Sequence, residues 1–246
     1  MFHELWLDAP EQLTQHVVAW GQRLIISRML TAIKPDAVSV SIPFNQKRLK
    51  ALGVQSEVLP LFGNIMPGKQ EALFSAKPPK PSSPSILYFG CAPRGAYLRQ
   101  LLQGLSAYCR AAPDALSIIV VSGQSLNKDI FIQALQTELA AHKVDIVDCD
   151  FMESDALSDL MRRCTVGVAR SAPYLLGKSG SAIAMLEHGL PVWLPKWRNN
   201  EPLDYDFRPH LIHPDLRAAF HPGPRPDYAS RLPEVATEFI HQLSGK

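Results

Sequence analysis

The chain has 246 residues, of which 46% are hydrophobic and 20% charged, and its 25 basic and 23 acidic side chains give a formal net charge of +2. These values are typical of a globular protein and exclude a collagen-like, coiled-coil or wholly disordered chain. The charge does not call for nucleic acid as a partner, and no run of about 18 apolar residues predicts a membrane span.

Cysteine usage and the N-terminal sequence favour a cytoplasmic location. The four cysteines are far apart and form no C-x-x-C pair, which disfavours a disulfide framework or a zinc ribbon and favours a reducing compartment. Residues 1–6 lack the basic-then-apolar pattern of a signal peptide. We therefore expect a cytoplasmic protein.

Length and proline content together predict two domains of unequal size joined by a linker. At about 150 residues per domain, the chain corresponds to between one and two domains. Five of its 21 prolines lie in segment 67–84, where the lost donors and the restricted backbone favour a semi-rigid interdomain linker. The predicted parts are a partial α/β domain at 1–66, the linker at 67–84, a larger domain at 85–222 and a C-terminal helical segment at 223–246.

Before the linker, apolar spacing predicts a helix over 11–33. Leu13, Val17 and Trp20 recur at intervals that place them on one helical face, and the Lys34-Pro35 pair ends the helix. A strand at 38–42, a helix at 44–52 and a strand at 58–59 are predicted to follow.

After the linker, strands alternate regularly with helices. Apolar runs predict strands at 86–89, 118–121, 144–147, 165–169 and 192–194. Amphipathic stretches between them predict helices, including one that Ser154 caps. Near-continuous apolar strands that alternate with helices favour a parallel sheet covered on both faces. We therefore predict a doubly wound, Rossmann-like α/β domain, in which ligands bind at the carboxyl ends of the strands.

The most informative segment is 177–192, GKSGSAIAMLEHGLPV, which runs from a turn into a helix and on to a strand. The first N–H groups of a helix lack partners, and the helix dipole favours an anion there. Gly180 allows a phosphate to approach the backbone, and Lys178 adds a cation. Glu187 lies about two turns into this helix, where a carboxylate could accept hydrogen bonds from ribose hydroxyls.

This segment resembles the donor-binding segment of GT-B fold glycosyltransferases, in the retaining group whose hallmark is E-x7-E. In that family the second Glu binds the nucleotide ribose and the helix N-terminus binds the diphosphate. The resemblance implies that Glu187 binds ribose and that Lys178, Ser179, Gly180 and Ser181 bind the diphosphate. Ser179 stands where the first Glu of the family contacts the sugar, so the choice of sugar is left open.

Other parts of the chain carry the same resemblance with less specificity. The strand at 86–90 followed by Arg94 resembles the first strand of the donor domain, where a basic residue steadies the diphosphate. Residues 1–66 resemble the closing part of an acceptor domain. The segment 223–246 resembles the terminal helix that crosses back toward that domain.

The resemblance implies a hexosyltransferase-type enzyme that transfers a sugar from a UDP- or GDP-sugar to an unidentified carbohydrate or lipid-linked acceptor. No cofactor and no metal are required, because cations and a helix N-terminus can stabilise the leaving diphosphate. Peripheral membrane contact, and a missing N-terminal segment or partner chain, are further expectations.

Two alternatives stay open at this stage. A GT-B enzyme needs two complete domains, so the chain could instead be a truncated, non-catalytic remnant that only binds nucleotide. The second alternative is a P-loop NTPase, because Ala172-x4-Gly177-Lys178-Ser179 satisfies the permissive form of that motif. The Asp148-Cys149-Asp150 triplet mimics a metal-binding D-x-D motif, but paired carboxylates at this spacing are common.

Overall fold

The computed structural model describes residues 5–6, 12–67, 84–112, 114–197, 201, 203–221 and 223–244. Their contacts divide the chain into two units. Unit 1 comprises the described residues up to Leu61 together with those from Leu232 onward, and unit 2 is Phe62–Arg231. The predicted linker at 67–84 lies, apart from its two end residues, outside the described residues.

Unit 2 contains a six-stranded sheet in which every neighbouring pair is parallel, in the order β5-β4-β3-β6-β7-β8. Its strands are β3 (Ser85–Phe89), β4 (Leu116–Val121), β5 (Val144–Cys149), β6 (Val166–Val168), β7 (Val192–Trp193) and β8 (Ile212–His213). This is the strand order of the Rossmann fold, with the topological switch point between β3 and β6. The predicted α/β class with a parallel Rossmann-like sheet is confirmed.

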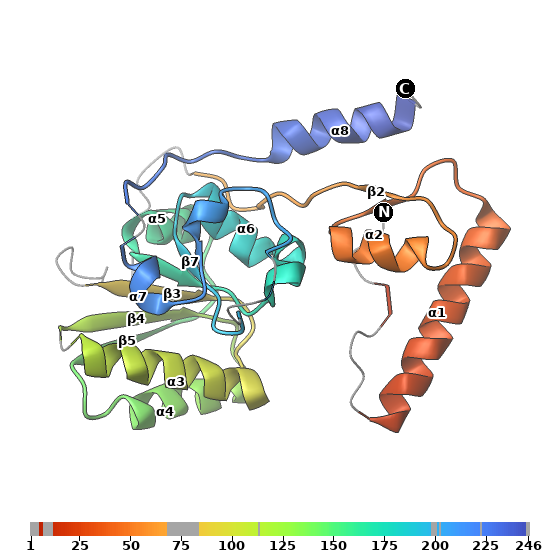
Figure 1. The fold of residues 1–246 in the computed structure, drawn as a ribbon. Helices are drawn as coiled ribbons and strands as arrows, with labels where there is room; N and C mark the ends of the chain where they lie inside the picture. The colour runs from red at the N-terminus through yellow and green to blue at the C-terminus, as the bar shows by residue number, and fades with distance from the viewer. Residues whose placement is uncertain are drawn as a thin grey trace. The chain divides into compact units, whose positions relative to one another are not determined.

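Helices cover both faces of this sheet (Figure 1). Ile86 and Tyr88 of β3 pack on one face, and Leu87 between them packs on the other, as the alternation of side chains along a strand requires. The first face carries α3 (Gly95–Ala111), α4 (Leu126–Glu138) and α7 (Leu216–Ala219), and the second carries α5 (Ser154–Arg163) and α6 (Gly180–Glu187).

Serine caps begin two of these helices. The side chain of Ser125 accepts a hydrogen bond from the Lys128 N–H at the start of α4, and Ser179 accepts one from Ala182 at the start of α6. The expected cap at Ser154 is wrong by one position, because Glu153 has the extended backbone of the N-cap and Ser154 is the first helical residue.

Unit 1 contains a two-stranded parallel sheet of β1 (Ser39–Val40) and β2 (Glu57–Val58) within the residues that are described. Its helices are α1 (Leu13–Ile33), α2 (Pro43–Lys50) and α8 (Leu232–Ser244). The buried residues of its small core are Leu5, Ile26, Leu30, Val40 and Leu49. Ser39 Oγ donates a hydrogen bond to Gln242 Oε1 at 2.6 Å, which joins α8 to the edge of the sheet.

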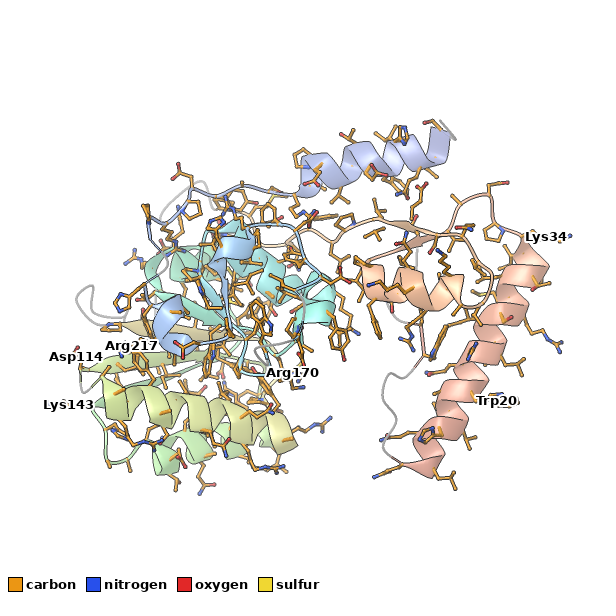
Figure 2. The ribbon with its side chains drawn as sticks, in the orientation of Figure 1. Trp20, Lys34, Asp114, Lys143, Arg170 and Arg217 are labelled. Atoms are coloured by element: carbon orange, nitrogen blue, oxygen red, sulfur yellow. The ribbon has the colours of Figure 1, made fainter. Side chains whose placement is uncertain are left out.

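The periodic apolar stripe of α1 is exposed to solvent. Leu13, Val17 and Trp20 are 81%, 63% and 67% exposed, and Trp20 is labelled in Figure 2. The helix packs instead through Ile26 and Leu30, which lie on another face. Most of the N-terminal half of α1 therefore contributes little to the core of unit 1.

The terminal helix begins at Leu232, within the predicted C-terminal segment 223–246. Pro224 and Pro226 disfavour helix in the preceding segment, and that segment packs within unit 2 instead. Arg225 donates hydrogen bonds to the carbonyl oxygens of Cys164 and His188. No helix among the described residues is long and apolar enough to cross a bilayer.

Candidate functional site

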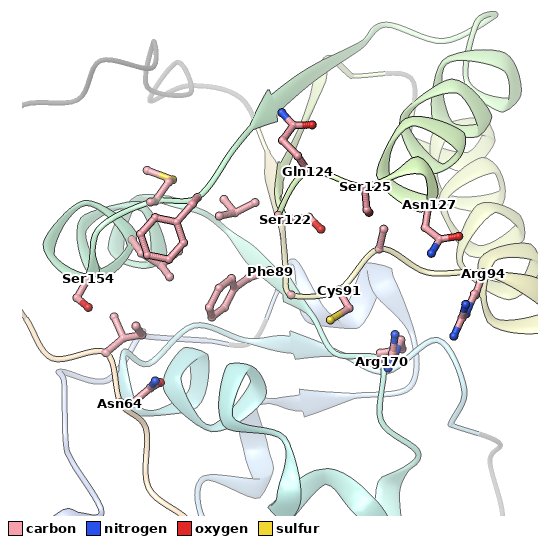
Figure 3. A pocket seen from close by; sticks show the side chains of 18 residues that line it. Asn64, Phe89, Cys91, Arg94, Ser122, Gln124, Ser125, Asn127, Ser154 and Arg170 are labelled. Carbon is pink, nitrogen blue, oxygen red and sulfur yellow. The ribbon is translucent and has the colours of Figure 1, made fainter.

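A cavity of about 760 Å³ opens at the carboxyl ends of the central strands of unit 2 (Figure 3). The residues after β3, β4, β5 and β6 all contribute to its walls. It therefore lies at the topological switch point of the sheet, where open parallel α/β sheets bind their ligands. Its size is typical of a site for a small organic ligand.

One end of the cavity is cationic. Arg94, the N-cap residue of α3, and Arg170, which follows β6, both line it, and Figure 3 shows their guanidinium groups at the same end. Both side chains belong to exposed residues, so a ligand can reach them. Paired guanidinium groups bind phosphate oxygens with good geometry, because each presents a planar fork of donors.

Two buried tyrosines hold the loops that carry these arginines. Tyr88 Oη donates to the carbonyl oxygen of Cys91 at 2.7 Å, and Tyr97 Oη donates to that of Ala169 at 3.2 Å. Burial raises the pKa of both phenols, so each stays a neutral donor. Gly90, with φ of 128°, makes the turn after β3 that few other residues could adopt.

The opposite part of the cavity is largely apolar. Phe89, Ile65 and Leu157 line it together with Phe151 and Met152. Phe151 is 82% exposed, although a ring of this size is usually buried. An exposed aromatic face in the same cavity as the arginine-lined end provides a stacking surface for a heterocyclic ring.

The walls at the β4 and β5 ends are joined by a buried lysine. Lys128 is fully buried, and its Nζ binds Asp148 Oδ1 at 2.7 Å and Asp150 Oδ1 at 2.8 Å. Burial alone lowers the pKa of Lys128, but the hydrogen bonds to the two carboxylates outweigh it and the pKa is raised. The two carboxylates of the D-x-D triplet therefore share one lysine, and no group of three metal-ligating side chains is present among the described residues.

The N-terminus of α6 lies beside the wall of the cavity. A Cβ placed on Gly90 would lie 3.9 Å from Ser181 Oγ, so the loop after β3 runs close to the first turn of α6. Ser179 Oγ and Ser181 Oγ are 3.3 Å apart. Of the residues singled out in the sequence, the structure thus brings Arg94 and the start of α6 to the same region.

Glu187 lies at the other end of α6 and does not line the cavity. Its carboxylate is fully buried, and Oε1 accepts a hydrogen bond from the backbone N–H of Arg231 at 2.8 Å. Oε2 has no hydrogen-bond partner and lies against Gly63, where any Cβ would overlap it. This carboxylate therefore contacts the first and last segments of unit 2.

The Walker-like segment does not form a phosphate-binding loop. Residues Pro173–Lys178 form a 3-10 helix, in which the N–H of Leu175 binds the carbonyl oxygen of Ala172. A phosphate cradle needs backbone N–H groups that point at the ligand, and Leu176 and Gly177 here are buried. This arrangement disfavours the P-loop alternative.

Sequence reasoning missed Arg170, Phe151 and the polar residues Ser122, Gln124 and Asn127, all of which line the cavity. The signal was available, because each of these residues lies within a few positions after a predicted strand. Carboxyl ends of parallel strands meet at one edge of the sheet, so any polar or aromatic residue there is a candidate for the site.

Among known proteins, the chain is similar to several solved structures, with low sequence identity to each. No family model and no curated protein matches the sequence. The chain is similar to the MnaA protein of S. aureus with UDP (9% identity, 85% of this chain and 54% of that one, TM-score 0.48). It is also similar to a mutant O-GlcNAc transferase from Thermobaculum terrenum (14%, 84% and 40%, TM-score 0.42).

A third similar structure is a protein assigned as a UDP-N-acetylglucosamine 2-epimerase from Listeria monocytogenes (13%, 74% and 46%, TM-score 0.43). The chain spans about half or less of the length of these proteins. The sheet order and the position of the cavity in unit 2 agree, at the level of fold, with the GT-B donor-domain resemblance that the sequence carries.

Proposed function

We propose that the cavity of unit 2 binds the nucleotide of a UDP- or GDP-sugar and that the chain is a glycosyltransferase. The observation that carries this proposal is a switch-point cavity with arginines at one end and an aromatic, apolar wall at the other. A nucleoside diphosphate has the same two parts, a dianionic or trianionic group and a flat heterocycle.

The proposed chemistry is electrostatic. Breaking the bond between sugar and diphosphate develops negative charge on the leaving group, and preorganised cations stabilise that charge. Arg94 and Arg170 supply the positive charge from the cavity wall. In the proposal Lys178 and the N–H groups near Ser179, Gly180 and Ser181 assist them, and neither a metal nor another cofactor is required.

The ribose role of Glu187 is a separate part of the proposal. The support for this role is the sequence resemblance. In the structure the buried carboxylate accepts a hydrogen bond from the Arg231 N–H instead. Replacement with Gln keeps the shape and one acceptor oxygen, so Glu187→Gln tests the role with the least disturbance. If Glu187 binds ribose, this variant loses affinity for UDP but not for pyrophosphate.

The partners beyond the nucleotide sugar also belong to the proposal. The acceptor is a carbohydrate or a lipid-linked carbohydrate in the cytoplasm. Peripheral membrane contact is compatible with either acceptor, and nucleic acid is not a partner.

The binding part is tested by thermal-shift and calorimetric titration of the full chain with UDP, GDP and ATP, with and without magnesium. UDP or GDP is expected to stabilise the protein without metal, and Arg170→Ala is expected to weaken binding roughly tenfold, as loss of a charge-assisted bond implies. Arg99→Ala is the matched control, because Arg99 is an exposed arginine of α3 that does not line the cavity. Magnesium-dependent binding of ATP alone would contradict the proposal.

The transfer part is tested by turnover with a panel of nucleotide sugars. The second candidate, a nucleotide-binding remnant, is favoured by the two-stranded sheet of unit 1 in its described residues, which is small for a complete acceptor domain. Tight binding of UDP or GDP without turnover across the panel would support the remnant. Release of UDP or GDP that depends on Arg170 would support the transferase.

A further inference from the structure

Lys128 is the most completely buried cation in the described part of unit 2. Its side chain is 0% exposed, whereas lysine is almost never fully buried unless it is paired. Its three N–H donors have three acceptors, namely Asp148 Oδ1 at 2.7 Å, Asp150 Oδ1 at 2.8 Å and the carbonyl oxygen of Cys149 at 3.0 Å. The ammonium group is therefore fully satisfied by one stretch of three residues.

The three acceptors belong to the carboxyl end of β5, whereas Lys128 belongs to the first turn of α4. Gln124 Nε2, in the loop between β4 and α4, donates to the same Oδ1 of Asp150. The cluster of Lys128, Asp148, Asp150 and Gln124 thus joins the loop after β4 to the segment after β5. We call it the Lys128 cluster.

Both joined segments form walls of the cavity. Ser122, Gln124 and Asn127 come from the β4 side, and Phe151 and Met152 come from the β5 side. The arginine-lined end is built from other loops, which follow β3 and β6 and are held by Tyr88 and Tyr97. The two ends of the cavity are therefore fixed by separate sets of contacts.

The two carboxylates do not need Lys128 for their own solvation, because Asp148 and Asp150 are 44% and 63% exposed. Water could solvate them if the lysine were absent. What the pairing adds is a side-chain link between two loops that are otherwise joined through the strands β4 and β5 and through the backbone hydrogen bond from the Ser122 N–H to the Cys149 carbonyl oxygen. A buried charge network with all its donors satisfied specifies one arrangement of the groups around it.

We propose that Lys128 is a positioning residue for the nucleoside half of the cavity, and that it acts by holding the loops after β4 and β5 in register while the diphosphate half is independent of it. The inference rests on the proposed function, since it assigns the base and the diphosphate to different ends of the same site. Phe151 and the polar residues of the loop after β4 are then the groups that Lys128 places.

The test compares UDP with inorganic pyrophosphate, by calorimetric titration of the full chain. Lys128→Met removes the ammonium group but keeps the length of the side chain. The expected result is a loss of about tenfold in UDP affinity, with pyrophosphate affinity unchanged within about twofold. A general loss of structure would weaken both ligands together, so the ratio of the two affinities separates positioning from folding.

Matched controls and a second variant protect this test from a folding failure. Lys143→Met replaces an exposed lysine just before β5 (labelled in Figure 2) and should change neither affinity. Asp150→Ala removes an exposed partner of both Lys128 and Gln124 and should cause a smaller loss that is again selective for UDP. Asp145→Ala, an exposed carboxylate of β5, is its control.

Equal losses for UDP and pyrophosphate, or no loss for either variant, would overturn the assignment while leaving nucleotide binding intact. Wild-type protein that binds pyrophosphate as tightly as UDP would also overturn it, because the nucleoside half would then contribute no affinity. Wild-type protein that binds no nucleotide would refute the proposed function and this inference with it.

Discussion

At the scale of single residues, the burial of a side chain was easier to predict from the sequence than its hydrogen-bond partners. Glu187 has apolar neighbours in sequence, Met185 and Leu186, and its complete burial follows that pattern. Its hydrogen-bond partner, the N–H of Arg231, is 44 positions away, and no local pattern encodes such a contact. Arg170 shows the opposite case, because its place directly after a predicted strand marks it as a site residue.

His188 provides a prediction about pH. Burial lowers its pKa, and the nearby guanidinium groups of Arg225, Arg162 and Arg208 lower it further. Its Nδ1–H donates to the carbonyl oxygen of Ala184 at 2.7 Å, and Nε2 accepts from Ser158 Oγ at 2.9 Å. The folded state thus prefers the neutral ring more strongly than the unfolded state does.

The sign of the effect follows from this preference. The unfolded chain binds the proton more readily, so the stability of neutral His188 is fully present above its unfolded pKa of about 6.5 and is lost as the pH falls below that value. Thermal unfolding is expected to occur at lower temperature as the pH falls from about 7.5 to about 5.5. The His188→Gln variant should show a shallower dependence.

A matched control for this pH series is His16→Gln, because His16 is exposed on α1. Burial also lowers the pKa of His213, so protonation of His213 adds to the loss of stability at low pH, and the variant of His188 reduces the slope without abolishing it. A slope that is the same in wild type and His188→Gln would contradict the assignment.

At the scale of elements, periodicity predicted whether a segment is a helix or a strand better than it predicted which other elements pack against that segment. The apolar runs predicted the strands β3, β4, β6 and β7 because these are buried strands between polar turns, and they predicted β5, which is only partly buried, from its alternating apolar residues. The strand β8 was missed, since Pro209 and Pro214 lie on either side of its two residues and prolines are typical of irregular backbone. The periodic stripe of α1 was found, but periodicity alone does not say what covers a face, and here it is exposed.

The exposed stripe of α1 leads to a prediction about stability. Trp20 and Leu24 are 67% and 42% exposed, so Trp20→Ser and Leu24→Ser should each change the free energy of unfolding by less than about 0.5 kcal/mol. Leu30→Ser in the buried face of the same helix should destabilise by about 2–4 kcal/mol. Denaturant titration of the full chain measures all three.

The same experiment reports on the surroundings of the helix in solution. Exposed apolar rings bind hydrophobic dyes, so Trp20→Ser is expected to lower the binding of such a dye to the native protein. A large destabilisation by Trp20→Ser would show that another surface covers the stripe in solution.

At the scale of the whole molecule, the sequence indicated the Rossmann-like part more completely than the division into units. The alternation of elements predicted the sheet, because each strand and helix carries its own pattern. The return of the chain from unit 2 to unit 1 at Leu232 depends on where residues 223–231 pack. Those residues are held by hydrogen bonds from arginine side chains to distant carbonyl oxygens, which no local pattern reveals.

The contacts of Glu187 also describe how unit 2 is connected. Gly63 and Arg231 both lie against one carboxylate, so the entry and the exit of unit 2 are neighbours. A unit whose two ends meet has the connectivity of an inserted domain, which can be removed or transplanted with little strain on its own fold. A fragment of residues 62–231 is therefore expected to unfold cooperatively and to keep its nucleotide affinity, and Glu187→Ala should lower its melting temperature by releasing both ends at once.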